Sequence, residues 1–218
     1  MQLAILLFDG VTALDAVGPY EVLSRLSGAE TVFVAAEPGP KRTDTGALAL
    51  VADRPLVDVP HPDVLLVPGG PATRQLVHDE TLMNWIRGAH ETSQWTTSVC
   101  TGALLLGAAG LLRGLEATTH WLALDELSAF GARPVQRRVV EQGKVITCAG
   151  VSAGIDMALT LAARIAGEDR ARGIQLGIEY DPQPPFDAGS PQRAPAALVE
   201  RLRRRARTQG ALFAKPTN

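Results

Sequence analysis

Short apolar runs alternate along the chain with stretches whose apolar residues recur at helical spacing. Such runs, when bounded by glycine, proline or polar residues, are typical of buried strands. We predict strands over residues 3–8, 31–36, 48–52 (at an edge), 63–68 and 94–99, and a hairpin from 139–140 and 145–148. We predict helices over residues 19–26, 82–90 with Asp79 as N-cap, 101–112, 120–129, 151–166 and 195–207.

Strands that are apolar on both faces and separated by helices indicate a mainly parallel sheet covered on both sides. The sequence therefore predicts a doubly wound α/β fold. Neither an internal repeat nor an interdomain linker is evident, so we expect one domain over residues 1–218. Proline and glycine make residues 181–195 irregular. The helix after them carries five arginines, which we interpret as a solvated face rather than a phosphate or nucleic-acid site.

Composition and sequence spacing exclude several classes of protein. The formal net charge is −2 and aromatic residues make up only 5%, which argues against a nucleic-acid binder. The apolar N-terminal run has no basic leader or small-residue cleavage site, and no uninterrupted apolar stretch reaches the ~20 residues of a membrane span. The two cysteines form no disulfide framework, and no His/Cys cluster has zinc-like spacing. We therefore expect a cytoplasmic protein without a structural metal.

Cys100 is the first candidate for chemistry, in the run Ser98-Val99-Cys100-Thr101-Gly102-Ala103. A tight turn from a strand into a helix needs small residues, and it resembles the nucleophile elbow of hydrolases with sulfur in place of oxygen. A thiol at a helix N-terminus is expected to have a lowered pKa. The alternative is that Cys100 is a small buried apolar residue.

Two further loops end at the same edge of the predicted sheet. Gly69 and Gly70 follow a buried strand, and their amides are candidates for binding charge that develops on a substrate, although such turns are common. Asp15 lies between apolar residues just before a predicted helix. In an apolar pocket its pKa would be raised, so that it could exchange protons near neutrality, but its position alone favours an N-cap.

His120 and Cys148 are the remaining reactive side chains of interest. His120 is either a general base or an ordinary hydrogen-bonded histidine at a helix start. Cys148 lies in a predicted core strand, and we interpret it as structural.

Taken together, five stretches resemble the ThiJ/PfpI superfamily, which has the class I glutamine amidotransferase-like, flavodoxin-like α/β fold. The resemblance runs from Ile5 to about Pro191. Its parts are Leu14-Asp15-Ala16-Val17-Gly18-Pro19, Val67-Pro68-Gly69-Gly70, Ser98-Val99-Cys100-Thr101-Gly102, Ala117-Thr118-Thr119-His120-Trp121 and Ala149-Gly150-Val151-Ser152-Ala153-Gly154-Ile155-Asp156.

In particular the chain resembles the isonitrile hydratases of this superfamily, which add water to an isonitrile to give an N-substituted formamide. The resemblance implies Cys100 as nucleophile, Asp15 as its acid/base partner and Thr101 as a residue that shapes the site. We expect the substrate and its developing charge to meet Gly69, Gly70, His120 and Val151. The resemblance also implies a homodimer and a Cys100 thioimidate intermediate that needs no cofactor.

Two other activities found in this superfamily agree less well with the sequence. PfpI-type peptidases have histidine after the cysteine, where this chain has Thr101, and relatives of human DJ-1 have glutamate where Asp15 stands. A glyoxalase or deglycase acting on small α-oxoaldehydes stays open as an alternative. So does a non-catalytic redox or ligand sensor, because an exposed thiol of low pKa oxidises readily.

Overall fold

The computed structural model describes residues 1–213, and the chain divides into two compact units. The first unit is Met1–Glu179, and the second begins at Tyr180. The second unit consists of an irregular segment followed by helix α7, Ala196–Phe213, where residues 195–207 were predicted to be helical. A single domain over residues 1–218 stays a prediction.

The first unit is built on a seven-stranded sheet of order β10-β11-β7-β6-β1-β2-β5. Every neighbouring pair is parallel except β10 with β11, which form the predicted hairpin. The mainly parallel doubly wound fold is therefore confirmed. In chain order the strands are β1 Gln2–Leu6, β2 Glu30–Ala35, β5 Arg54–Pro55, β6 Val64–Val67, β7 Trp95–Val99, β10 Val139–Gln142 and β11 Val145–Cys148.

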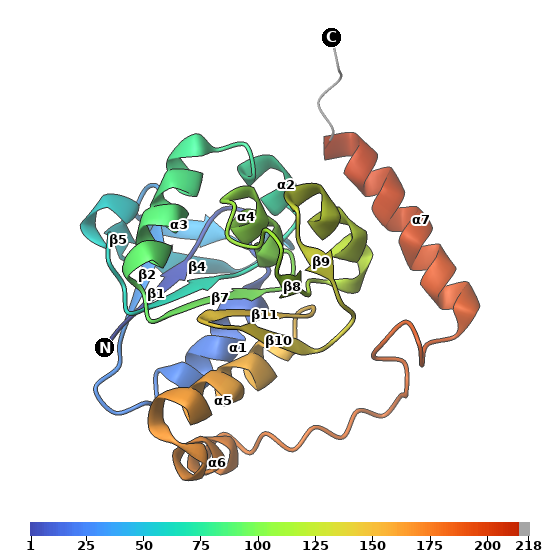
Figure 1. Ribbon diagram of the computed structural model, residues 1–218. Helices are drawn as coiled ribbons and strands as arrows, with labels where there is room; N and C mark the ends of the chain where they lie inside the picture. The colour runs from blue at the N-terminus through green and yellow to red at the C-terminus, as the bar shows by residue number, and fades with distance from the viewer. Residues whose placement is uncertain (214–218) are drawn as a thin grey trace. The chain divides into compact units, whose positions relative to one another are not determined.

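Helices cover both faces of this sheet (Figure 1). One face carries α1 Ala13–Leu23, α5 Ala153–Ala166 and α6 Glu168–Gly177. The other carries α3 Glu80–Thr92, α4 Gly102–Ala108 and the 3₁₀ helix η2 Trp121–Phe130. The short elements between these are β3 Gly39–Arg42, β4 Ala49–Ala52, the 3₁₀ helix η1 Leu56–Asp58, α2 Thr73–Leu76, β8 Glu116–Ala117 and β9 Arg133–Pro134.

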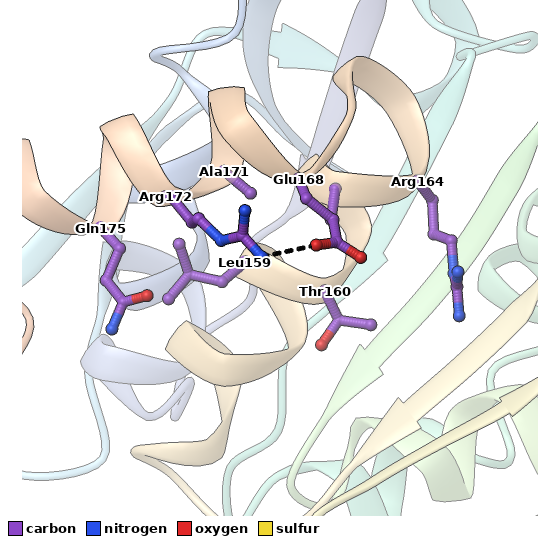
Figure 2. Close-up of a pocket in the computed structure, with 8 residues that line it drawn as sticks. Leu159, Thr160, Arg164, Glu168, Ala171, Arg172 and Gln175 are labelled. Carbon is purple, nitrogen blue, oxygen red and sulfur yellow. Dashed lines mark hydrogen bonds and ion pairs between the residues drawn. The ribbon is translucent and has the colours of Figure 1, made fainter.

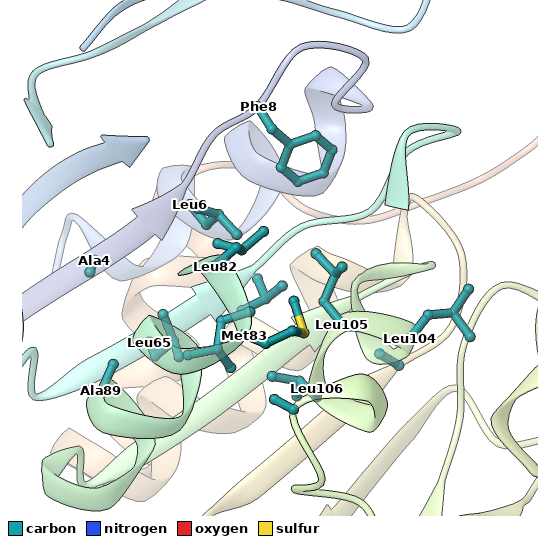
Figure 3. Packing of buried hydrophobic residues seen from close by; sticks show 14 of the residues in the cluster. Ala4, Leu6, Phe8, Leu65, Leu82, Met83, Ala89, Leu104, Leu105 and Leu106 are labelled. Carbon is teal, nitrogen blue, oxygen red and sulfur yellow. The ribbon is translucent and has the colours of Figure 1, made fainter. Parts of the chain in front are cut away.

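In the core between the sheet and α3, the apolar residues that recur at helical spacing are the ones that pack together (Figure 3). Leu82, Met83 and Ile86 recur at helical spacing and lie against strand residues such as Leu65 and against Leu105 of α4. Asp79 accepts a hydrogen bond from the Leu82 amide at 3.0 Å, which confirms the predicted N-cap.

The first helix differs most from its prediction. It was expected to start with Pro19, but α1 begins at Ala13 and contains Pro19 in its interior. Packing between α1 and α5 explains the difference: a Cβ on Gly154 would lie 3.1 Å from Pro19 Cγ, and one on Gly18 would lie 3.2 Å from Ile155 Cγ1. This close helix contact outweighs the hydrogen bond that proline cannot make.

Several element boundaries also moved. The strand predicted at 48–52 is β4, which pairs with β3 in a separate two-stranded sheet instead of forming an edge of the main one. The helix predicted at 101–112 ends at Ala108, and Gly110, whose φ is 86°, adopts the left-handed backbone that follows many helix ends. The α6 helix was not predicted, and the segment 120–129 is 3₁₀ rather than α-helical.

Candidate active site

The loop from β7 into α4 holds Cys100 in a strained conformation. Its φ is +56°, which a side chain other than glycine rarely adopts. The Cys100 amide donates to the Cys148 carbonyl at 3.2 Å, and the Thr119 hydroxyl donates to the Cys100 carbonyl at 2.6 Å. A Cβ on Gly102 would lie 2.1 Å from the Val67 carbonyl oxygen, so the predicted need for small residues is confirmed.

Asp15 lies in the first turn of α1, not before it, and Thr12 occupies the N-cap position. The N-cap interpretation of Asp15 is therefore wrong. Its side chain is fully buried: Oδ2 accepts from the Gly69 amide at 3.0 Å, while Oδ1 makes no hydrogen bond of standard geometry to a described residue. Burial is the main reason that the pKa of Asp15 rises from 3.8 to about 7, as was expected of a carboxyl in an apolar pocket.

The expected lowering of the Cys100 pKa is wrong. Burial, followed by the negative charge of Asp15, raises the pKa of the thiol. The amides of Thr101 and Val151, which face the sulfur, act in the opposite direction but do not offset burial. The thiol therefore keeps its proton at neutral pH, and Asp15 is the neighbouring group that can accept it.

The Gly69–Gly70 turn is hydrogen-bonded to both Asp15 and Thr101. The Gly70 amide donates to Thr101 Oγ1 at 2.9 Å, and the Thr101 hydroxyl donates back to the Gly70 carbonyl at 3.1 Å. With the Gly69 amide on Asp15, both glycine amides have acceptors within the protein. The structure thus gives the turn a supporting role, and direct contact of these amides with a substrate stays a prediction.

Gly69→Ala is expected to destabilise the fold by about 1–3 kcal/mol. Its new Cβ would lie 2.5 Å from the Thr101 amide nitrogen and 2.8 Å from Asp15 Oδ2, and neither backbone nor carboxyl can move away cheaply. Urea unfolding measures the effect. The matched control is Gly88→Ala in α3, where no atom lies within 4 Å of the new Cβ, and a gain of about 0.5–1 kcal/mol is expected. Equal effects at the two positions would contradict the prediction.

His120 lies against Gly150, the residue that precedes Val151. Val151 has a φ of +23°, and a Cβ on the preceding Gly150 would lie 2.3 Å from His120 Cδ2. His120 begins η2, where its Nδ1 accepts from the Leu122 amide at 3.3 Å. Burial and then the charge of Arg74 lower the pKa of His120, so the ring is neutral at pH 7, and the bond at Nδ1 assigns its proton to Nε2. It is thus a hydrogen-bonded histidine at a helix start, close to Val151.

Sequence reasoning did not single out Thr119 or the loop containing Asp44. The hydroxyl of Thr12 donates to Asp44 Oδ2 at 2.8 Å, and the Thr12 amide donates to the Gly69 carbonyl at 2.9 Å. The negative charge of Asp44 contributes to the raised pKa of Asp15. No local pattern marks such residues, because β3 and β4 bring the Asp44 loop to α1 only in the fold.

A surface pocket of about 350 Å³ lies apart from these residues, along α5 and α6 (Figure 2). Its lining includes Leu159, Arg164, Glu168 and Arg172. Arg172 pairs with Glu168 at 2.7 Å, and Arg164 pairs with Glu141 at 2.9 Å. These guanidinium groups already have protein carboxylates, and none of the predicted site residues lines the pocket.

Among residues 1–213, no cluster of three or more His, Cys, Asp or Glu side chains is arranged to hold a metal ion. Nor does any helix there combine the length and hydropathy needed to span a bilayer.

Known proteins share both the sequence and the fold. The model of the DJ-1/PfpI family matches residues 1–164. The chain is 46% identical over 206 residues to the isonitrile hydratase of Pseudomonas putida, covering 94% of this chain and 90% of that protein. It is 30% identical over 152 residues to the HTH-type transcriptional regulator CdhR of Pseudomonas aeruginosa, covering 69% of this chain and 43% of that protein.

Among solved structures, a ThiJ/PfpI family protein from Pseudomonas syringae superimposes with a TM-score of 0.90 at 39% identity, covering 93% of this chain and 84% of that one. Toxoplasma gondii DJ-1 in its oxidised form superimposes with a TM-score of 0.73 at 22% identity, covering 83% of this chain and 99% of that one. The second likeness shows a shared fold alone.

Proposed function

The chain belongs to the DJ-1/PfpI family, and on this premise we propose that it is an isonitrile hydratase that forms a thioimidate on Cys100. The observation that carries the proposal is the buried pair of Asp15 and Cys100, in which a carboxyl with a pKa of about 7 faces a thiol that keeps its proton. The high identity to the hydratase of Pseudomonas putida supports the same substrate class.

In the first step, the Asp15 carboxylate accepts the thiol proton and the sulfur attacks the electrophilic isonitrile carbon. Asp15 then gives that proton to the same carbon, which leaves a neutral thioimidate. The amides of Thr101 and Val151 face the sulfur and stabilise the negative charge that it carries during attack.

In the second step, the Asp15 carboxylate takes a proton from water as the water oxygen attacks the thioimidate carbon. Asp15 gives this proton to the substrate nitrogen and is again a carboxylate. The carbon–sulfur bond then breaks, and the remaining hydroxyl proton passes through Asp15 to the sulfur. The product is an N-substituted formamide. One carboxyl serves both steps because each step restores the form that the next one needs.

The proposal is tested by incubating the purified protein separately with an aryl isonitrile and with methylglyoxal. We expect formation of the formamide and no consumption of methylglyoxal. Consumption of methylglyoxal alone would instead support the glyoxalase alternative. Absence of turnover on both substrates would support the sensor alternative, in which oxidation of the buried thiol depends on Asp15 to accept its proton and not on exposure or a low thiol pKa.

The pH dependence of kcat/KM follows from the carboxyl–thiol pair. Below pH 7 both groups hold protons and no base is available, whereas above it Asp15 is ionised and can accept the thiol proton. Activity is therefore expected to rise with pH through a midpoint of about 7 and then reach a plateau. A profile that is flat between pH 5 and 9 would contradict this assignment.

Asp44→Asn is expected to move this midpoint to lower pH, because removing a nearby negative charge makes Asp15 easier to ionise. Asp44 is exposed, so solvent and salt screen its effect, and the shift should be about 0.3 of a pH unit at low salt. Asp53→Asn removes the same charge from another exposed position and should leave the midpoint unchanged. Equal shifts in both variants would indicate a general charge effect.

We also propose that the protein acts in the cytoplasm as a homodimer. Size-exclusion chromatography with light scattering tests the dimer.

A further inference from the structure

The proposed reaction uses one of the two cysteines, and the other lies directly beside it. In the register of β7 with β11, Val99 is the partner of Cys148, so Cys100 is one residue beyond the paired position. The main chains are joined there, because the Cys100 amide donates to the Cys148 carbonyl at 3.2 Å. Both side chains belong to the same buried cluster on the α5 face of the sheet.

The main-chain hydrogen bond limits how far apart the two residues lie, although Cys100 has already left β7. Hydrogen-bonded neighbouring strands are about 4.8 Å apart, and Cys100 follows the paired position by one residue, so its Cα lies roughly 6 Å from that of Cys148. That separation falls inside the range of about 4.4–6.8 Å found in disulfides. The two thiols also interact electrostatically, and the Cys100 amide contacts the Cys148 thiol, which agrees with sulfur atoms on the same side of the sheet.

We propose that Cys148 is a resolving thiol, which captures oxidised Cys100 as an intramolecular disulfide and so protects the nucleophile from irreversible oxidation. The oxidant is a peroxide. The Cys100 sulfur attacks one peroxide oxygen, the O–O bond breaks, and the sulfur is oxidised to a sulfenic acid while the other oxygen leaves as water. Asp15 takes the thiol proton and passes it to the leaving oxygen.

In the second step the Cys148 sulfur attacks the sulfenic sulfur. The S–O bond breaks, the hydroxyl leaves with the Cys148 thiol proton as water, and an S–S bond forms. A sulfenic acid next to a thiol takes this route instead of advancing to the sulfinic acid, which thiols do not reduce. The disulfide blocks the proposed nucleophile until a dithiol reduces it. Capture is favoured by proximity, because Cys148 is fully buried in the same cluster as Cys100 and its main chain is hydrogen-bonded to that of Cys100.

The test treats the full-length protein with a small molar excess of hydrogen peroxide, blocks free thiols under denaturing conditions and identifies the products by peptide mass spectrometry. We expect the Cys100 and Cys148 peptides to be linked, with a mass two hydrogens below their sum, and the link to be reversed by dithiothreitol. In Cys148→Ala and Cys148→Ser the same treatment should drive Cys100 to the sulfinic acid, which dithiothreitol does not reverse.

The proposal is overturned if wild-type Cys100 accumulates as sulfinic acid while Cys148 is recovered as a free, alkylated thiol. It is also overturned if both Cys148 variants show the same Cys100 products as the wild type. Circular dichroism of each variant checks that it is folded, and the more stable variant is used. The readout is a covalent product, so it holds whether or not the protein hydrates isonitriles.

Discussion

Cys100→Ala is expected to abolish isonitrile hydration, with a loss of at least about 10³-fold in kcat/KM. Without the sulfur no thioimidate forms, and Asp15 alone cannot supply the nucleophile that attacks the isonitrile carbon first. The fold should survive, because alanine at this position removes one buried atom and leaves intact the backbone contacts with Thr119 and Cys148. Formamide production by purified protein gives the rate.

The matched control for this loss is Cys148→Ala. It removes the same atom from the neighbouring strand of the same buried cluster, and hydration should continue at a rate close to that of the wild type. If Cys100→Ala retained more than a tenth of wild-type turnover, the covalent mechanism would be wrong. Trapping supports the same point: acid quenching during turnover should capture the substrate on the Cys100 peptide.

Asp15→Asn is expected to lower the rate of hydration while it raises the stability of the fold above pH 7. Hydration should fall by about 10²–10⁴-fold, since the amide can neither accept the thiol proton nor deliver it to carbon. Above pH 7, however, the variant should be more stable than the wild type. The asparagine amide carries no charge to bury, and its oxygen can still accept the Gly69 hydrogen bond that Asp15 Oδ2 accepts at 3.0 Å.

The sign of the stability effect follows from the raised pKa of Asp15. In the unfolded chain the carboxyl ionises near 3.8, whereas in the fold it holds its proton up to about 7. Between these values the folded state binds more protons, so wild-type stability falls as pH rises from 4 to 7 and is constant above that range. The full difference is up to about 4 kcal/mol, and Asp15→Asn should lack it.

Urea unfolding of both proteins at pH 4.5 and pH 8 measures this difference. The gap between Asp15→Asn and the wild type should widen toward pH 8. Asp53→Asn, at an exposed position, should follow the wild type at both values. A variant less stable than the wild type at pH 8 would mean that the ionised carboxyl stabilises the fold, contrary to its burial.

Much of the fold could be predicted because it depends on local pattern. Apolar runs located β1, β2, β6, β7 and the β10–β11 hairpin, and Asp79 before a helical pattern located the start of α3. The start of α1 could not be predicted, since Pro19 normally opens a helix. Here contact with Gly154 and Ile155, more than a hundred residues away in the sequence, stabilises it in the interior.

The candidate site, like the fold, could be predicted where it depends on local pattern and not where it depends on packing. The small residues after Cys100 predicted the elbow, and the apolar neighbours of Asp15 predicted its raised pKa. The shift of the Cys100 pKa was predicted with the wrong sign. A helix N-terminus is visible in sequence, but the depth of burial that outweighs it is a property of the assembled core. Asp44 was missed for a related reason, as its loop meets α1 only through the pairing of β3 with β4.

The glycines around Cys100 also bear on how this protein could change over time. Gly69, Gly70, Gly102 and Gly150 each lack space for even a methyl group, because a backbone or ring atom lies within 2.5 Å of where it would stand. The immediate surroundings of the thiol at these four glycines are thus made largely of main chain, and single substitutions cannot change the shape of the main chain gradually. A change of substrate during evolution therefore has to come from side chains farther from the thiol, while Cys100, Asp15 and the main chain around them stay the same.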